Sequence, residues 1–222
     1  MIPDLSAVFE AYERLQMEAD AVFARVREGV PEGVRCREGC ADCCHALFDL
    51  SLVEAMYINR AFLAAFDHGP RRSEIMARAS KVDRDLTKFK RDMYHAEKNG
   101  EAPGDIMISA AGLKSPCPLL DENNRCLLYA ARPITCRIYG VPTAIAGQAH
   151  VCGFSGFEKG KPYPTVYLDK IHARLDEMGR DVKEAVNSRF SALHEVYVPL
   201  SMALLTNYDE RYLGIGPAKK EG

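Results

Sequence analysis

The first part of the chain carries apolar residues at steps of three and four positions. This spacing places them on one face of an α-helix. It predicts a helix in segment 3–29, with Asp4 as its N-cap and with Gly29 and Pro31 as stop signals. The residues of this apolar face are Leu5, Val8, Phe9, Tyr12, Leu15, Ala19, Val22 and Val26.

Two more helices are predicted before residue 100. Ser51 and Glu54 have the spacing of a capping box, so a second helix should begin there and run to about Phe66. The third helix has a narrow apolar stripe, like the seam of a coiled coil, and should end at Asn99-Gly100. The residues of the stripe are Ile75, Ala79, Val82, Leu86, Phe89 and Met93.

The middle of the chain is rich in turn signals. Residues 101–116 contain two prolines and two glycines and are expected to form a loop. Residues 117–129 resemble a small hairpin, because the Asn123-Asn124 pair suits positions that need a positive φ. Pro133 can be the first residue of a short helix. Residues 140–164, with five glycines and three prolines, are expected to be irregular.

Helical patterning returns in segment 166–206, and the tail from Gly214 is expected to fray. The chain is therefore predicted to be mainly α, a single helical domain over residues 1–222. Its helices flank an irregular cysteine-rich metal-binding region at 36–152 that includes a small β-hairpin. The apolar positions of the last segment are Leu168, Ile171, Leu175, Met178, Val182, Leu200, Ala203 and Leu204.

Composition and charge narrow the class of protein. Of the 222 residues, 47% are apolar and 27% are charged, which are values of an ordinary globular chain. The formal net charge of −2 lacks the basic surplus of a nucleic-acid-binding protein. No apolar stretch approaches the roughly 20 residues that cross a bilayer, and the N-terminus lacks the pattern of a secretory signal. We therefore expect a cytoplasmic protein with neither nucleic acid nor membrane as a partner.

Eight cysteines are the unusual feature of the composition. Four of them fall within nine residues, spaced C-x3-C-x2-C-C, so disulfides would need four separate partners at one spot. A reducing compartment also disfavours disulfides, whereas thiolates in a tight loop readily converge on a metal. We therefore predict that all eight are metal ligands. They are Cys36, Cys40, Cys43, Cys44, Cys117, Cys126, Cys136 and Cys152.

The thiolate ligands suit zinc or an iron–sulfur cluster. Structural zinc sites usually take two short pairs such as C-x2-C, and the spacings here lack two such pairs. The crowded run is more typical of ferredoxin-type loops, although their own spacing differs. An iron–sulfur cluster is therefore favoured over zinc as the cofactor. The eight thiols can supply either two four-sulfur sites or one. The sequence does not show which cysteines would share a site.

Basic residues close to the cysteines are candidates to offset thiolate charge. Four thiolates on a zinc ion, or on a doubly charged cluster, leave a net charge of −2 that guanidinium groups could balance. Arg132 and Arg137 are the two arginines assigned to this role. His45 and His150 also lie near cysteines, but the eight thiols already suffice for two sites, so ordinary imidazoles are favoured.

The combined pattern resembles a known bacterial family. It is similar to the YkgJ family of cysteine-cluster proteins in five segments. These are the run from Cys36 to Cys44, Cys117-Pro118-Leu119-Leu120, Cys126-Leu127-Leu128-Tyr129, Arg132-Pro133 and Cys136-Arg137-Ile138-Tyr139. This family is also called the zinc- or iron-chelating CxxxCxxCC domain. The resemblance covers about residues 36–152 and implies metal chelation, with Cys152 aligned least securely. A related flagellin lysine methylase shares the cysteine pattern, which makes an enzyme role an alternative by analogy.

The favoured function is that of a metal-binding protein acting in electron transfer, redox sensing or metal handling, with a redox partner protein in the first two cases. Two alternatives are a structural zinc module and a protein-modifying enzyme similar to the lysine methylase. Radical SAM chemistry is less favoured. Its C-x3-C-x2-C motif is present, but the strand expected just before that motif, the Gly-Gly-Glu motif and the βα alternation are not.

Overall fold

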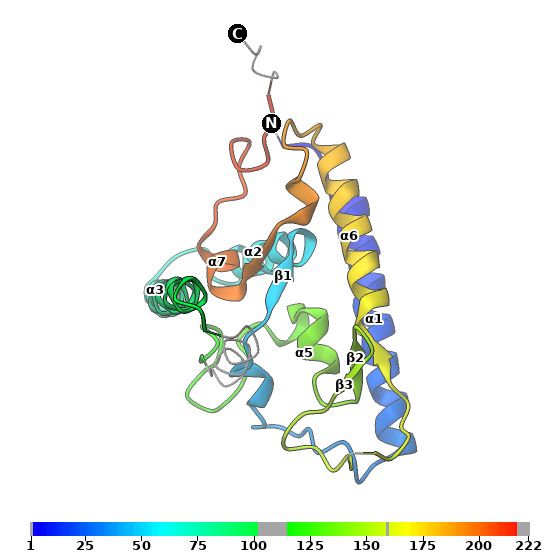
Figure 1. The fold of residues 1–222 in the computed structure, drawn as a ribbon. Coiled ribbons are helices and arrows are strands. Elements are labelled where there is room, and N and C mark those ends of the chain that lie inside the picture. The colour runs from blue at the N-terminus through cyan, green and yellow to red at the C-terminus, as the bar shows by residue number, and fades with distance from the viewer. Residues whose placement is uncertain (1, 102–114, 159, 217–222) are drawn as a thin grey trace.

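The computed structural model describes residues 2–101, 115–158 and 160–216. With 52% helix and 8% strand it confirms the predicted mainly α class (Figure 1). The α-helices are α1 (Ser6–Gly29), α2 (Leu52–Ala65), α3 (Pro70–Lys98), α5 (Ile134–Ile138), α6 (Leu168–Ala185) and α7 (Leu200–Leu205). The 3-10 turns are η1 (Asp42–Cys44), η2 (Tyr129–Ala131) and η3 (Leu193–Glu195). The strands are β1 (Asp49–Ser51), β2 (Thr143–Ile145), β3 (Gln148–His150), β4 (Val166–Tyr167) and β5 (Tyr197–Pro199).

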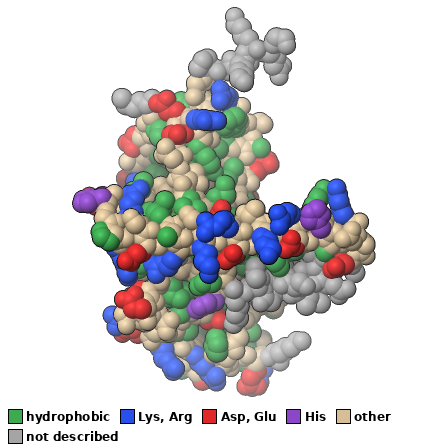
Figure 2. All heavy atoms as spheres, turned by 90° about the vertical axis from the view of Figure 1, so that its left-hand side faces the viewer, with side chains coloured by type: hydrophobic (Ala, Val, Ile, Leu, Met, Phe, Trp, Pro, Cys, Tyr) green, Lys and Arg blue, Asp and Glu red, His purple; other side chains and the backbone are tan. Residues whose placement is uncertain are grey.

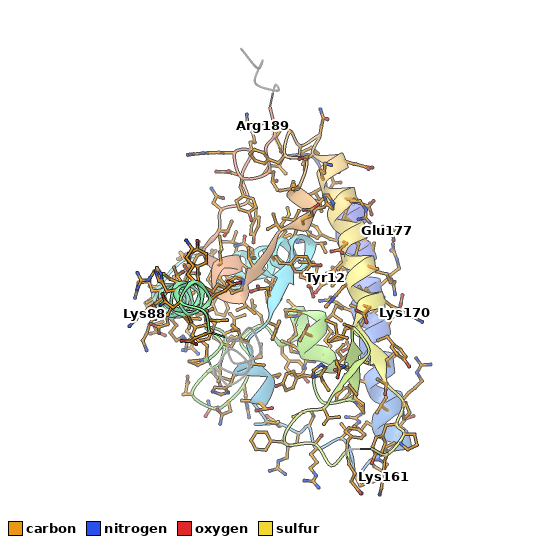
Figure 3. The ribbon with its side chains drawn as sticks, in the orientation of Figure 1. Tyr12, Lys88, Lys161, Lys170, Glu177 and Arg189 are labelled. Carbon is orange, nitrogen blue, oxygen red and sulfur yellow. The ribbon has the colours of Figure 1, made fainter. Side chains whose placement is uncertain are left out.

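Helices α1 and α6 lie side by side along one edge of the molecule (Figure 1). The predicted apolar faces of both helices are confirmed, and Tyr12 points from α1 into the interior, whereas Lys170 and Glu177 lie on the outer side of α6 (Figure 3). The predicted N-cap is wrong by one residue, because Leu5 is the N-cap of α1. Asp4 lies just before it, and its carboxylate accepts a hydrogen bond from the Ser6 N–H at 2.9 Å.

Helix α2 lies between two hydrophobic cores. Leu52, Val53 and Met56 belong to the core formed with α1, α5 and α6. Ile58 and Phe62 belong to the core formed with α3 and α7. A helix that is apolar on both faces is stable only when it is covered on both sides, so α2 is the element that joins the two cores.

Helix α3 begins directly after Gly69, whose φ of 93° suits glycine, and has Pro70 in its first turn. Its predicted stripe is covered in the first half, where Ile75 and Leu86 are buried, and is only partly covered beyond that. Figure 2 shows α3 crossing the middle of the molecule, with Lys and Arg interleaved with Asp and Glu on its exposed side. Basic residues outnumber acidic ones along this helix.

The short strands correct two expectations. Residues 140–164 are not wholly irregular, because β2 and β3 pair antiparallel through a turn at Ala146-Gly147, where φ is 48° and 76°. Segment 166–206 is interrupted between α6 and α7 by η3 and by β5, which pairs with β1. Strands of two or three residues are too short for an alternating pattern, and this explains why periodicity missed them.

The predicted hairpin at 117–129 is reduced to one bridge between Leu120 and Cys126, and Asn124 has the expected positive φ, at 58°. The predicted helix after Arg132 exists as α5, with Pro133 as its N-cap instead of its first residue. Most of the expected loop at 101–116, and most of the tail, lie outside the described residues. Within the described ranges, no helix is long and apolar enough to cross a membrane.

A buried carboxylate connects three helices. The predicted capping box is present: the Ser51 N–H and hydroxyl donate to Glu54 Oε2 at 3.2 and 3.0 Å. The other carboxylate oxygen accepts from the Ile134 N–H at 3.1 Å, at the start of α5, and from the Tyr12 hydroxyl of α1 at 3.4 Å. Burial raises the pKa of Glu54. This side chain therefore caps both α2 and α5.

We predict that Glu54→Ala lowers the free energy of unfolding by about 2–4 kcal/mol, because it leaves buried N–H and O–H donors without acceptors. Glu177→Ala, on the exposed side of α6, is the control and should change stability by less than about 0.5 kcal/mol. Urea unfolding followed by circular dichroism measures both. Equal stability of the two variants would contradict the role assigned to Glu54.

Candidate metal centre

All eight cysteines line one cavity of about 780 Å³, and all eight are free thiols. They reach it from three parts of the chain: the loop between α1 and β1, the segment from Cys117 to α5, and the loop after β3. The two stretches of cysteines are therefore together in space, as a shared metal site requires.

The first four cysteines lie on a loop of tight turns. Gly39 has a φ of 81°, and the Cys40 N–H donates to the carbonyl oxygen of Arg37 at 3.0 Å. The 3-10 turn η1 then carries Cys43 and Cys44. Local turns of this kind bring neighbouring sulfurs to one side without regular secondary structure.

The second group is joined directly to the first by the backbone. The Cys117 N–H donates to the carbonyl oxygen of Cys44 at 2.7 Å. Cys126 faces Leu120 across the bridge of the small hairpin, which brings Cys126 back toward Cys117. Leu119 and Leu128, which flank these cysteines, are buried in the core formed with α3 and α7.

Helix α5 presents Cys136 to the cavity. Its Ile134 and Ile138 are each 1% exposed in the core formed with α1 and α6. The Arg137 guanidinium is buried and saturated: it pairs with Asp20 of α1 at 2.5 Å and donates to two backbone carbonyl oxygens, of Ala130 and Arg132. Arg137 lines the cavity, but its donors are committed to holding α5 on α1.

Cys152 enters through the loop that follows β3. The Gly156 N–H donates to the carbonyl oxygen of Gly33 at 2.8 Å, so this loop lies against the segment that precedes Cys36. The Cys152 thiol donates to Asp42 Oδ2 at 3.3 Å and accepts from the Phe154 N–H at 3.4 Å. Cys152 is buried, whereas Cys36 is exposed at the other side of this group.

Burial raises the pKa of most of the thiols. It raises the pKa of Cys36 to about 11 and that of Cys117 to about 12, and neighbouring sulfurs add to the effect. The pKa of Cys126, Cys136 and Cys152 is raised for the same reason. A hydrogen bond from the Cys44 thiol, itself held protonated by this contact and by burial, lowers the pKa of Cys43 to about 7.

Arg132 is the cation that faces the thiols. Its positive charge offsets part of the burial that raises the pKa of Cys36, Cys126 and Cys136, and adds to the hydrogen bond that lowers the pKa of Cys43. The guanidinium stacks on Tyr129, 3.5 Å from the ring centroid, and its Nε donates to the Tyr129 carbonyl oxygen at 3.0 Å. The position of the guanidinium at the lining of the cavity is thus fixed by the backbone and the ring.

The donor set fits a thiophilic metal. Thiolates are soft ligands that suit zinc and iron–sulfur clusters. Among residues 2–101, 115–158 and 160–216, no three His, Cys, Asp or Glu side chains are already gathered as the ligands of one metal ion. A χ1 rotation redirects the sulfur of a cysteine, so convergence of these thiols on a metal would include changes of side-chain rotamer.

Two residues of the site were not found from the sequence. Asp42 lies between Cys40 and Cys43 and hydrogen-bonds to Cys152, and an acidic residue inside the run was the available signal. Gly140 lies under Cys36: a Cβ at this position would come within 2.2 Å of the Cys36 Sγ. No sequence pattern marks such a close approach, because it joins residues more than 100 positions apart.

The histidines do not line the cavity. His45 Nδ1 lies 2.9 Å from the carbonyl oxygen of Ala41, and His150 is exposed on β3. Tyr129 and Tyr139 line the cavity, as does Arg125, which pairs with Glu38 at 2.7 Å. The polar lining of the site therefore comes from the cysteines, from arginines and from carboxylates.

Comparison with known proteins gives one match. The family described as "Putative zinc- or iron-chelating domain", CxxCxxCC, matches residues 35–153, which is more than half of the chain. No curated protein and no solved structure matches the chain. The matched range begins one residue before Cys36 and ends one residue after Cys152, so it contains every cysteine of the cavity.

We predict that Gly140→Ala displaces the Cys36 sulfur, because the added methyl group cannot occupy the same space. The variant should lose about 1–3 kcal/mol of stability and hold less metal than the unmodified chain. Gly153→Ala is the matched control, since a Cβ there meets nothing within 4 Å although Cys152 is adjacent. Metal analysis and urea unfolding of both variants test this. The steric role of Gly140 is wrong if both variants keep full metal content.

Proposed function

The chain belongs to the family of zinc- or iron-chelating CxxCxxCC domains, and on this premise we propose that it holds an iron–sulfur cluster through cysteine thiolates and uses it in electron transfer or redox sensing. The observation that carries the proposal is that eight free thiols, from segments far apart in the sequence, line one cavity. We also place the protein in the cytoplasm, because a reducing compartment keeps clustered thiols available to a metal.

The spacing of the first four cysteines favours a cluster over zinc, because the chain lacks the two C-x2-C pairs that are usual for structural zinc. The Phe154 N–H donates to the Cys152 sulfur at 3.4 Å, and backbone N–H groups of Leu119 and Leu128 offset part of the burial that raises the pKa of Cys117 and Cys126. Such groups stabilise thiolate charge on a bound metal and are one of the means by which proteins tune the potential of iron–sulfur clusters.

Arg132 supports a redox role, since a fixed guanidinium beside the thiols offsets part of the negative charge of a thiolate-bound centre. A bound cluster supplies one-electron chemistry near the surface. The chain would hold it with buried thiols on one side and with the exposed Cys36 on the side from which a redox partner protein approaches.

Radical SAM chemistry has less support than this redox role. Its motif follows a strand in a barrel of alternating strands and helices. Here α1 and a loop precede Cys36, and the strands of the described residues are two or three residues long.

The test is purification of the full chain without oxygen, followed by analysis of iron, acid-labile sulfide and zinc and by the visible spectrum. Iron with sulfide and a broad charge-transfer absorption that bleaches on reduction is the expected result. Zinc alone would overturn the iron–sulfur assignment in favour of a structural zinc module. A colourless protein that holds neither metal would overturn metal binding by this cavity.

We predict that Arg132→Gln lowers the midpoint potential of the centre by on the order of tens of millivolts, because reduction then adds negative charge without a nearby cation. Arg125→Gln is the control, since that guanidinium lines the same cavity but pairs with Glu38. Redox titration followed in the visible spectrum measures both. Equal potentials for the two variants would contradict the role of Arg132.

A further inference from the structure

We propose that the cavity contains two metal subsites of different composition, an inner one built only from thiolates and an outer one that includes the carboxylate of Asp42. This inference rests on the proposed metal binding. The inner set is Cys44, Cys117, Cys126 and Cys136. The outer set is Cys36, Cys40, Cys152 and Asp42. Cys43 lies between the two sets and is shared by them.

Backbone pairing places the outer residues together. The bond from the Gly156 N–H to the Gly33 carbonyl oxygen holds the loop of Cys152 against the segment that leads to Cys36. The Cys152 sulfur lies 3.3 Å from Asp42 Oδ2. Cys36 lies over Gly140, where the absence of a side chain gives its sulfur room. These contacts involve none of the inner cysteines.

A separate set of contacts places the inner residues together. The Cys117 N–H bonds to the carbonyl oxygen of Cys44 at 2.7 Å. The bridge between Leu120 and Cys126 closes the small hairpin, so the segments of these three cysteines form one unit. Helix α5 adds Cys136 to the lining of the same cavity.

Neighbouring thiols divide in the same way. The Cys36 thiol interacts electrostatically with those of Cys40, Cys152 and Cys43. The Cys136 thiol interacts with those of Cys43, Cys117 and Cys126. Cys43 is the one thiol that contributes to both groups, and this agrees with its place between the subsites.

Asp42 supplies the oxygen donor of the outer set. Its carboxylate is within hydrogen-bond distance of the Cys152 sulfur and accepts a hydrogen bond from the Tyr139 hydroxyl. Carboxylate oxygen is an accepted ligand of zinc and of iron, and a ligating carboxylate commonly has such a hydrogen-bonding neighbour. Cys36 gives the outer subsite an exposed thiol, whereas Cys152 of the same set is buried.

The first test compares Cys136→Ser with Cys152→Ser in the full chain prepared without oxygen. Each variant should keep about half of the metal of the unmodified protein, since each removes a ligand of one subsite only. Cys43→Ser should reduce occupancy of both subsites. Far-UV circular dichroism confirms that each variant is folded, and Cys126→Ser and Cys40→Ser replace any that is not.

The outcomes separate the two proposals. If the unmodified protein holds no metal, the proposed function fails and the partition fails with it. If the unmodified protein holds metal but every single variant loses all of it, the cavity is one site and only the partition is overturned. Loss of about half in Cys136→Ser and in Cys152→Ser supports two subsites.

The second test addresses Asp42 by competition between the protein and a chelator for zinc. Asp42→Asn should weaken the outer subsite by about tenfold or more and leave the inner one unchanged. Glu38→Gln, an acidic residue that lines the same cavity, is the control. Tyr139→Phe keeps the carboxylate and removes its hydrogen bond, so a smaller effect is expected there. Equal affinities for Asp42→Asn and Glu38→Gln would overturn the oxygen ligand.

Discussion

The cavity depends on one constraint. Segments that carry buried thiols must be held close together, although burial and the proximity of other sulfurs both disfavour the ionised form of each thiol. The fold meets this constraint by anchoring the segments in two separate cores. Leu119 and Leu128 fix the hairpin cysteines to the core of α3 and α7, and Ile134 and Ile138 fix Cys136 to the core of α1 and α6. The cavity therefore lies where the two cores meet.

Helix α2 holds the two anchored groups of cysteines in place relative to each other, because its side chains contribute to both cores. Glu54, at its N-terminus, adds a polar link, since one carboxylate caps α2 and also α5, the helix that presents Cys136. Asn59 adds another, since its amide donates to the Ala203 carbonyl oxygen of α7 at 2.9 Å. Buried polar groups of this kind fix the relative position of helices more strictly than apolar packing does. The positions of the thiols therefore depend on contacts in the protein interior and not only on the surface loops.

The sequence predicted those parts of the fold that repeat a local pattern. The apolar faces of α1 and α6, the capping box at Ser51 and the positive φ at Asn124 all follow from residues close together along the chain. The cysteines were candidates because of their number and spacing. The strands of two or three residues, the hydrogen bond between Asp42 and Cys152, and the close approach of Gly140 to Cys36 were missed. Each depends on contacts between distant segments, which local periodicity does not record.

Arg132 and Arg137 illustrate why nearness in sequence does not fix a role. Both were assigned to the metal centre, yet Arg137 is saturated by Asp20 and by backbone carbonyl oxygens. On a helix, neighbouring side chains point about 100° apart, so when Cys136 faces the cavity the next residue faces α1. Arg132 lies before the helix, on the ring of Tyr129, and keeps its charge beside the thiols. Arg137 thus fixes the helix that carries a sulfur, and Arg132 is the arginine that we propose offsets the charge of a thiolate-bound centre.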